Sequence, residues 1–237
     1  MSLLTMVQNI AADQGLTQPT AVLTDTSRDT VQMLRAIYRT GQDLRRRHDW
    51  PELIVEATIT LVNGTATYAF PLDFERVIFD THWNEDETDR VLFMGPVEYE
   101  RYLRGGASTA IGQRFIAIGS GANQLTIYPT PDAGNAGQKV YFLYISNKWT
   151  SSAGTAAAAF AADTATSLID EALVELGAKY LFKRENNLPG WELDRKDYLD
   201  AIPVAATAKS SARTLSLCGG RRQRFLSFAN IPEGNFG

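Results

Sequence analysis

The chain has 237 residues, of which 44% are apolar and 21% charged, and its net charge is −4. This composition allows a sizeable globular core, and the negative charge argues against a general nucleic-acid binder, whose surface is normally basic. No apolar run approaches the ~20 residues that span a bilayer. The first residues lack the basic leader and long apolar stretch of a secretory signal, and the single cysteine, Cys218, excludes an internal disulfide and fits a reducing compartment.

Two helices are predicted at the start of the chain. Apolar residues recur on one helical face over residues 2–14, with Ser2 as N-cap and Gly15 as a stop signal. A second helix is predicted from Ser27 to His48, with apolar residues at three- and four-residue steps. The arginines of its last turn, Arg45 to Arg47, suit the partial negative charge of a helix end, and binding of a partner is the alternative interpretation.

Between residues 52 and 149 apolar residues recur at every second position instead of at helical spacing, which predicts strands. Residues 53–62 and 65–70 flank Asn63-Gly64 and predict a β-hairpin, because Asn-Gly adopts the positive φ of tight hairpin turns. Short strands at this spacing are typical of a small antiparallel sandwich or barrel. Further strands are predicted at 76–83, 90–94, 113–119, 124–130 and 139–146, with one short helix at 95–106.

Helical periodicity returns in the last third of the chain. Residues 150–166 are small and of low complexity, which predicts a linker. A helix is then expected with Ser167 as its cap, followed by a break at residues 186–190. The last helix is expected from Trp191, with Pro203 kinking or interrupting it.

The predicted fold class is α+β. Each helix pair is too amphipathic to stand alone, so the N- and C-terminal helices should pack into one antiparallel bundle. The expected divisions are residues 1–50 and 163–208 for this bundle, 51–150 for an inserted β-sandwich or barrel, 151–162 for a linker, and 209–237 for an extended C-terminal arm.

The charge is unevenly distributed along the chain. Residues 209–237 hold five Lys or Arg and one Glu, a net charge of +4, which leaves −8 for residues 1–208. This arm is rich in Gly and Ser without a helical period, yet it mixes arginines with aromatic residues, which are typical interface anchors. We predict that it docks onto a partner protein, the alternative being a frayed terminus. The predicted docking residues are Arg213, Arg221, Arg222, Arg224, Phe225, Phe228, Ile231 and Phe236.

The residue types that catalysis and metal binding require are scarce. The two histidines, His48 and His82, have no second His or Cys at zinc-ligand spacing. Cys218 has no base near it in sequence, and the acidic run at 84–89 lacks the glycine and the bidentate Glu of a calcium loop. We therefore predict neither an enzyme nor a bound metal or cofactor.

Several strings of the sequence resemble head-to-tail connector (adaptor) proteins of tailed bacteriophages, and they stand in the family's order. They are LLTMVQNIAADQGLTQPTAV, the helix end RRRHDWPEL, FMGPVEYERYLRG, RFIAIGSGANQLTIYPTPDAG and the closing helical pair. YAFPLDF resembles the family's Tyr-x-Leu-Pro-x-Asp-Phe, with Phe70 in place of Leu. Residues 163–165 stand where the family usually has Asp-Thr-Asp, and Ala165 departs from that motif. The resemblance covers most of residues 1–202. The arm is the part of the chain that it covers least.

The resemblance implies a structural part of the virion neck, made in the host cytoplasm. Such adaptors, including tail tubular proteins, form a ring, commonly of twelve copies, beneath the portal protein. They extend the DNA channel and offer a surface to the next tail or nozzle protein, while the C-terminal arm reaches up the portal. An acidic channel wall would repel DNA phosphates, so we expect many acids to face the lumen or the lower rim, the alternative being acids spread over a solvated surface. DNA is expected to pass without sequence-specific binding. No membrane is involved.

Two alternatives stay open. The chain is another neck or tail-completion protein that contacts a different partner, or its β region is a carbohydrate- or receptor-binding module. The second alternative requires Trp83, Tyr128, Tyr141 and Trp149 to be exposed on one face, whereas the alternation of the strands predicts that most are core.

Overall fold

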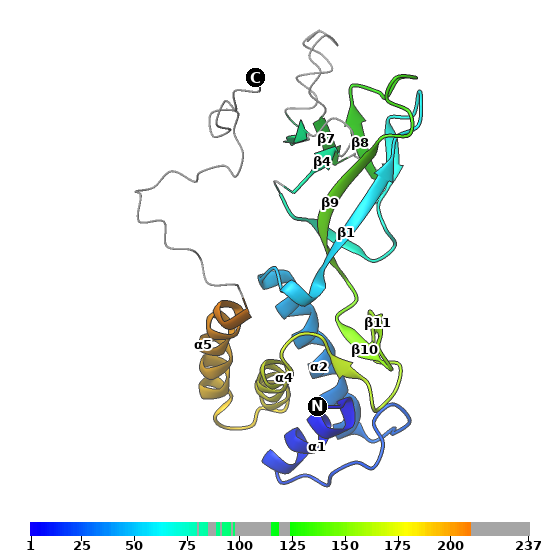
Figure 1. Cartoon of the computed structure of the whole chain (residues 1–237). Helices are drawn as coiled ribbons and strands as arrows, with labels where there is room; N and C mark the ends of the chain where they lie inside the picture. Colours follow the sequence, from blue (N-terminus) through cyan, green and yellow to red (C-terminus); the bar gives the residue numbers. More distant parts are fainter. Residues whose placement is uncertain are drawn as a thin grey trace, which may run out of the picture.

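The computed structural model describes residues 1–79, 81–84, 89–90, 92–95, 97, 115–118 and 124–209. Figure 1 shows the helices gathered at one end of the molecule, with strands β1 and β9 extending away from them. The predicted helix at 95–106 and the predicted arm at 209–237 lie outside the described residues, apart from residues 95, 97 and 209.

Both N-terminal helices are confirmed. α1 (Leu3–Asp13) begins at Ser2, whose Oγ accepts a hydrogen bond from the Thr5 amide at 3.2 Å. Gly15 follows it with a φ of +66°, a conformation that suits glycine at a helix end. α2 (Arg28–Arg47) ends at His48, and a short 3₁₀ turn (Pro51–Leu53) leads into the strands.

The C-terminal helices differ from the prediction in two details. α4 (Glu171–Glu185) is capped by Asp170 rather than by Ser167, because the Leu168 amide donates to the Trp149 carbonyl and holds the preceding residues in a small sheet. α5 (Trp191–Lys209) continues through Pro203 and is not interrupted there. Proline removes only one backbone donor, and the packed residues Tyr198 and Ala206 lie on either side of it.

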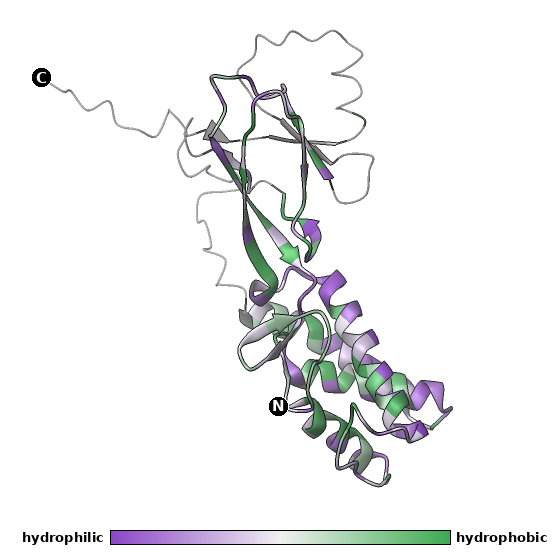
Figure 2. Ribbon diagram, turned by 90° about the vertical axis from the view of Figure 1, so that its right-hand side faces the viewer, coloured by the Kyte–Doolittle hydropathy of each residue, from purple (hydrophilic) through white to green (hydrophobic). Residues whose placement is uncertain are grey.

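Helices from both ends of the chain share one core. α4 contacts α1, α2 and α5, and Figure 2 shows apolar residues along the contacting sides of the helices. Two close approaches depend on glycine. A Cβ on Gly41 would lie 2.4 Å from the ring of the buried Trp149, and one on Gly177 would lie 2.3 Å from the Thr40 Cγ2. The largest fully buried side chains of this core include Trp50, Trp149, Tyr198, Leu3, Met6, Ile10, Met33, Ile37, Leu44 and Leu53.

The β region holds two sheets around a second core. The first sheet has the order β1-β9-β4-β5, with β3 also paired to β9, and the second has the order β2-β8-β7-β6. All these pairs are antiparallel except β6 with β7. The bounds are β1 Ile54–Thr60, β2 Thr67–Ala69, β3 Phe74–Val77, β4 Trp83–Asn84, β5 Asp89–Arg90, β6 Leu92–Met94, β7 Phe115–Ile118, β8 Gln124–Tyr128 and β9 Lys139–Ser146.

Side chains from both sheets meet in this second core, which is the arrangement of a small sandwich. Its buried members are Ala57, Ile59, Leu61, Phe70, Val77, Leu125, Ile127, Val140, Phe142 and Tyr144. Two predicted strands are divided: residues 76–83 hold the end of β3 and the start of β4, and residues 90–94 hold the end of β5 and all of β6.

The predicted hairpin around Asn63-Gly64 is wrong. The turn itself is present, since Gly64 has a φ of +74° and the Thr65 amide donates to the Val62 carbonyl at 3.0 Å. However, β1 pairs with β9 and β2 pairs with β8, so the turn passes the chain from one sheet to the other. A local turn signal does not determine which distant strand each flanking segment joins.

Residues 151–162 do not form an unstructured linker. β10 (Thr150–Ser152), β11 (Thr155–Ala157) and β12 (Thr166–Ser167) make a three-stranded sheet beside the helices. Ala153 and Gly154 both have positive φ, as a tight hairpin turn requires. Phe160 is buried against Tyr38 and Trp149. Small residues thus allow a close hairpin here rather than a flexible connection.

None of the helices in the described part of the chain combines the length and apolar character needed to cross a membrane.

Candidate functional site

The residues predicted to dock onto a partner lie outside the described residues. These are Arg213, Arg221, Arg222, Arg224, Phe225, Phe228, Ile231 and Phe236. The structure does describe α5, the helix that precedes them and ends at Lys209. The described part has further surfaces that could contact other proteins, and side-chain contacts fix those surfaces in place.

A polar joint connects the end of α2 to β3. The Arg76 guanidinium donates to the backbone carbonyls of Arg45 (2.9 Å) and His48 (3.0 Å) and to the Asp49 carboxylate (2.5 Å). It thereby satisfies carbonyls that a helix end leaves without partners and places a cation at the negative end of the helix. A β-bulge between Phe74 and Arg76 redirects the strand at this point. No local pattern in the sequence points to Arg76, because its partners lie in another part of the chain.

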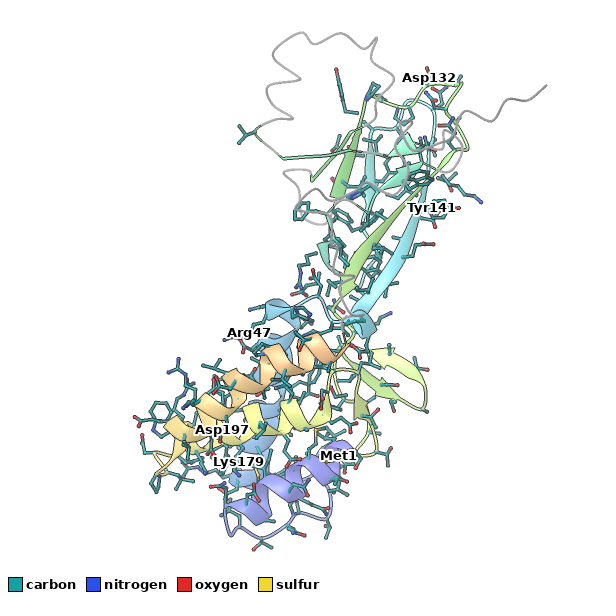
Figure 3. The ribbon with its side chains drawn as sticks, turned by 60° about the vertical axis from the view of Figure 1, so that its left-hand side comes forward. Met1, Arg47, Asp132, Tyr141, Lys179 and Asp197 are labelled. Carbon is teal, nitrogen blue, oxygen red and sulfur yellow. The ribbon has the colours of Figure 1, made fainter. Side chains whose placement is uncertain are left out.

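The three arginines of the last turn of α2 have different environments. Arg45 is the most buried; it donates to the Asn147 carbonyl at 3.0 Å and pairs with Glu75 at 3.0 Å. Arg47 pairs with Asp43 one turn earlier at 2.6 Å, and Figure 3 shows it where the helices meet the strands. Arg46 is 70% exposed, with only a 3.9 Å approach to Glu75. Contacts within the chain therefore occupy Arg45 and Arg47, and Arg46 has the most exposed of these three side chains.

A tight turn before β3 presents a leucine to solvent. The Phe74 amide donates to the Pro71 carbonyl at 3.0 Å, which closes the turn. The rings of Phe70 and Phe74 stack at 3.8 Å and pack against Phe142 and Tyr144. Between them Leu72 is 98% exposed. These are the residues of the string YAFPLDF, so this string encodes a stacked turn rather than a simple start of a strand.

Asp73 fixes this turn to β9. Its carboxylate accepts hydrogen bonds from the Tyr144 hydroxyl (3.0 Å) and the Ser146 hydroxyl (2.8 Å), and its carbonyl accepts from the Asn147 amide (2.7 Å). Burial by itself would raise the pKa of Asp73, but the hydrogen bonds from Ser146 and Tyr144 outweigh burial and hold that pKa below its ordinary value. Burial and the bond to Asp73 raise the pKa of Tyr144 to about 12.

A second carboxylate holds the loop between α1 and α2. The two oxygens of Asp163 accept the Val22 and Leu23 amides, each at 3.0 Å. The Leu3 amide donates to the carbonyl of Ala165, which is 1% exposed. Asp163, the first residue of the motif that resembles Asp-Thr-Asp, thus has a structural role. At its third position Ala165 stands in place of Asp, and the backbone carbonyl of Ala165 binds α1.

The outer face of the first sheet carries an exposed tryptophan beside a half-buried tyrosine. Trp83 lies opposite Tyr141, and Tyr141 lies opposite Thr58 on the other side of β9. Trp83 is 46% exposed. Together with Glu56, Thr81, Phe142 and Leu143, these two aromatic residues line an open hollow of about 590 Å³. Figure 3 shows Tyr141 on the β part, away from the helices.

The four aromatic residues of the carbohydrate-binding alternative do not share this face. Trp149 is 1% exposed in the helical core, and Tyr128 is half-buried on the second sheet. Only Trp83 and Tyr141 stand together. Of the four, Trp149 alone is buried, Tyr128 and Tyr141 are half-buried and Trp83 is exposed, so the expectation that most of them are core is not met.

Many acidic residues of the helical part are already paired. Lys179 bonds Asp13 and Lys183 pairs with Asp194, both at 2.6 Å. Further acids lie exposed at Glu192, Asp197 and Asp200 along α5. Within the described ranges, no group of three or more His, Cys, Asp or Glu residues is placed to hold a metal ion.

Comparison with protein families found a match over residues 1–217 to a family described as SU10 adaptor protein. The match covers every helix and strand described above, so the chain belongs to the SU10 adaptor protein family, a family of phage head–tail adaptors. A search of curated proteins found no match. Membership confirms the resemblance to head-to-tail adaptors and implies a structural role in the virion.

Proposed function

We propose that this SU10 adaptor family member docks as a ring beneath the portal protein, extends the DNA channel and offers the attachment surface for the tail. The observation that carries the proposal is the family match over residues 1–217. The structure supports it with an architecture suited to a connecting part: a helical core, a projecting β-sandwich and a polar joint that fixes one to the other.

The C-terminal arm is the proposed portal contact. It carries a net charge of +4 and follows directly on α5, which ends at Lys209. Its arginines can make bidentate contacts with acidic portal groups, and its phenylalanines can fill apolar pockets. An arm that becomes ordered on docking loses chain entropy. Many arms acting together in a ring compensate for a weak affinity of each one.

The remaining proposed partners follow from the same position in the neck. Neighbouring copies of the chain, commonly twelve in adaptor rings, contact one another side by side, and a downstream tail or nozzle protein binds the far end. DNA passes through the ring without sequence-specific binding. Exposed acids such as Asp197 and Asp200 are proposed to face the lumen, where they would repel phosphates.

A mixing experiment with purified portal rings tests this function. We expect the protein to be monomeric or weakly associated alone, and to co-migrate with the portal in size-exclusion chromatography as a ring visible by electron microscopy. A portal-independent elution position, at every ratio of the two proteins, would contradict the proposal.

Arm variants separate portal docking from folding. Deleting residues 210–237 should abolish co-migration while leaving the melting temperature unchanged, because the described core contains none of these residues. A milder variant, R221E/R222E/R224E, should weaken docking with the chain length preserved. If the truncated protein still binds the portal, the arm is not the anchor, and the alternative of a neck protein with a different partner gains support.

A further inference from the structure

The exposed leucine of the Pro71–Phe74 turn is held in a fixed position. Single exposed apolar residues are common on protein surfaces and need no explanation by themselves. Leu72 differs because the turn that carries it is closed by a backbone hydrogen bond, backed by the stacked rings of Phe70 and Phe74, and anchored through Asp73 to β9. Because the backbone that carries Leu72 is already ordered, only the rotamer freedom of its side chain is lost when it enters a partner's pocket.

The hollow beside Trp83 has the complementary chemistry. Its walls are mainly aromatic and aliphatic, from Trp83, Tyr141, Leu143 and part of Phe142, and its polar members are Thr81 and the carboxylate of Glu56. Such a hollow accepts an apolar side chain accompanied by a cation, which the aromatic faces and the carboxylate both attract. Leu72 has such a cation next to it: the Lys148 ammonium lies 3.7 Å from the Asp73 carboxylate, on a side chain 45% exposed.

The leucine and the hollow lie on opposite sides of the first sheet. Successive residues of a strand point to opposite faces. Phe142 and Tyr144 point inward and contact the rings of Phe70 and Phe74, so the turn lies on the inner side. Tyr141 and Leu143 alternate with them and line the hollow on the outer side. Leu72 is almost fully exposed on this turn. The turn and the hollow thus belong to opposite sides of the first sheet.

We propose that Leu72 of one copy seats in the Trp83–Tyr141 hollow of the next copy, with Lys148 of the first facing Glu56 of the second. This inference rests on the ring assembly put forward above. A ring closes through heterologous contacts, in which two different patches on opposite sides of each subunit fit each other. The apolar and charge complementarity of the two patches and their opposite directions make a second copy of this chain the occupant.

Cross-linking in the assembled ring tests the contact directly. The background is C218S, which removes the single native thiol. Leu72→Cys combined with Glu56→Cys should give a ladder of covalent oligomers with a short bis-maleimide when the portal is present. Each single cysteine should give none. The matched control pairs Glu56→Cys with Val204→Cys, a residue of α5 that is 66% exposed, and should also give none.

A charge exchange tests the same contact without cross-linking. Leu72→Asp should lower ring formation on the portal at least about tenfold, as loss of an interface anchor does, while Val204→Asp should not. Lys148→Glu and Glu56→Lys should each weaken the ring, and the double exchange should restore it. Melting temperatures of the isolated variants check that each protein is folded.

The outcomes distinguish this inference from the proposed function. If the wild-type protein forms no ring on the portal, the proposed function fails. If it forms rings that Leu72→Asp leaves intact, or rings that the cysteine pair does not link, only the Leu72 contact is wrong. The arm is the competing occupant of the hollow. If a Glu56→Cys variant that keeps the native Cys218 cross-links to it, and the Leu72 ladder is absent in the C218S background, the inference is overturned in favour of the arm.

Discussion

Asp73 is the residue on which the geometry of the exposed turn most depends. Its carboxylate accepts two side-chain hydroxyls and its backbone carbonyl accepts an amide. Asp73→Asn should lower the free energy of unfolding at neutral pH by about 1–3 kcal/mol, since a partly buried, charge-assisted acceptor is lost. Urea denaturation of the variant and the wild type measures the difference.

The pH dependence of this loss has a defined sign. The pKa of Asp73 is lower in the folded protein than in the unfolded chain. The stabilisation by Asp73 is therefore complete above about pH 4, the ordinary aspartate range, and is lost as the pH falls through the folded pKa. The difference between wild type and Asp73→Asn should shrink in acid. The exposed Asp197→Asn serves as control and should change stability little at either pH; a pH-independent deficit of the Asp73 variant would contradict this account.

Gly177 allows α4 to approach α2 and α5 closely. A Cβ there would lie 2.3 Å from Thr40 Cγ2 and 2.7 Å from the Tyr198 ring. Gly177→Ala should destabilise the protein by about 1–3 kcal/mol through overpacking, despite the better helix propensity of alanine. Gly134→Ala is the matched control, because its Cβ would meet only the Asp132 side chain at an ordinary 3.4 Å. Equal melting temperatures for the two variants would show that the helices can separate without cost.

At the scale of elements, the joint between α2 and β3 determines how the β-sandwich is held. Arg76→Ala removes every bond from this guanidinium to the carbonyls of Arg45 and His48 and to Asp49. We expect a loss of about 1–3 kcal/mol and faster proteolysis near residues 48–53, with the helical core intact. Arg46→Ala is the control, since the Arg46 side chain is 70% exposed. Cleavage at the same rate in both variants would show that the joint does not depend on Arg76.

The sequence predicts elements better than it predicts their partners. The bounds of α1, α2 and β9 follow from local period and capping, and Ser2 and Gly15 act as predicted. The pairing of β1 with β9 joins segments far apart in the chain, which no local signal encodes. Small residues suit a tight hairpin as well as a flexible linker. The composition of residues 151–162 therefore predicts a linker where the structure has a hairpin.

The candidate site shows the same limit. The pattern of alternating residues indicates that strands are present, but it does not indicate which aromatic side chains are exposed. The sequence therefore does not distinguish Trp83, which is exposed, from Trp149, which is buried. No sequence pattern marks Leu72 or Arg76 as a contact residue. The exposure of Leu72 depends on the turn that carries it, and the contacts of Arg76 depend on the register shift beside it. The arm residues stand on composition alone and remain a prediction.

At the scale of the whole molecule, one helical core is built from both ends of the described chain. A fragment of residues 1–165 lacks α4 and α5 and leaves the buried faces of α1 and α2 uncovered. We expect it to be insoluble alone, and soluble as a complex when it is co-expressed with residues 166–237. Size-exclusion chromatography and circular dichroism measure this. A monomeric, helical 1–165 fragment would show instead that the N-terminal helices form a separate unit.

The arrangement of α1 beside α4 has a consequence for synthesis on the ribosome. The first helices leave the exit tunnel long before α4 exists, and they must wait, or be held by a chaperone, while the strands between them are translated. The strands that line the hollow, β1, β4 and β9, by contrast, are made before α4 and can pair earlier. A nascent chain that ends before α4 lacks the helix that covers α1 and α2, so we expect it to expose apolar surface that chaperones and proteases recognise.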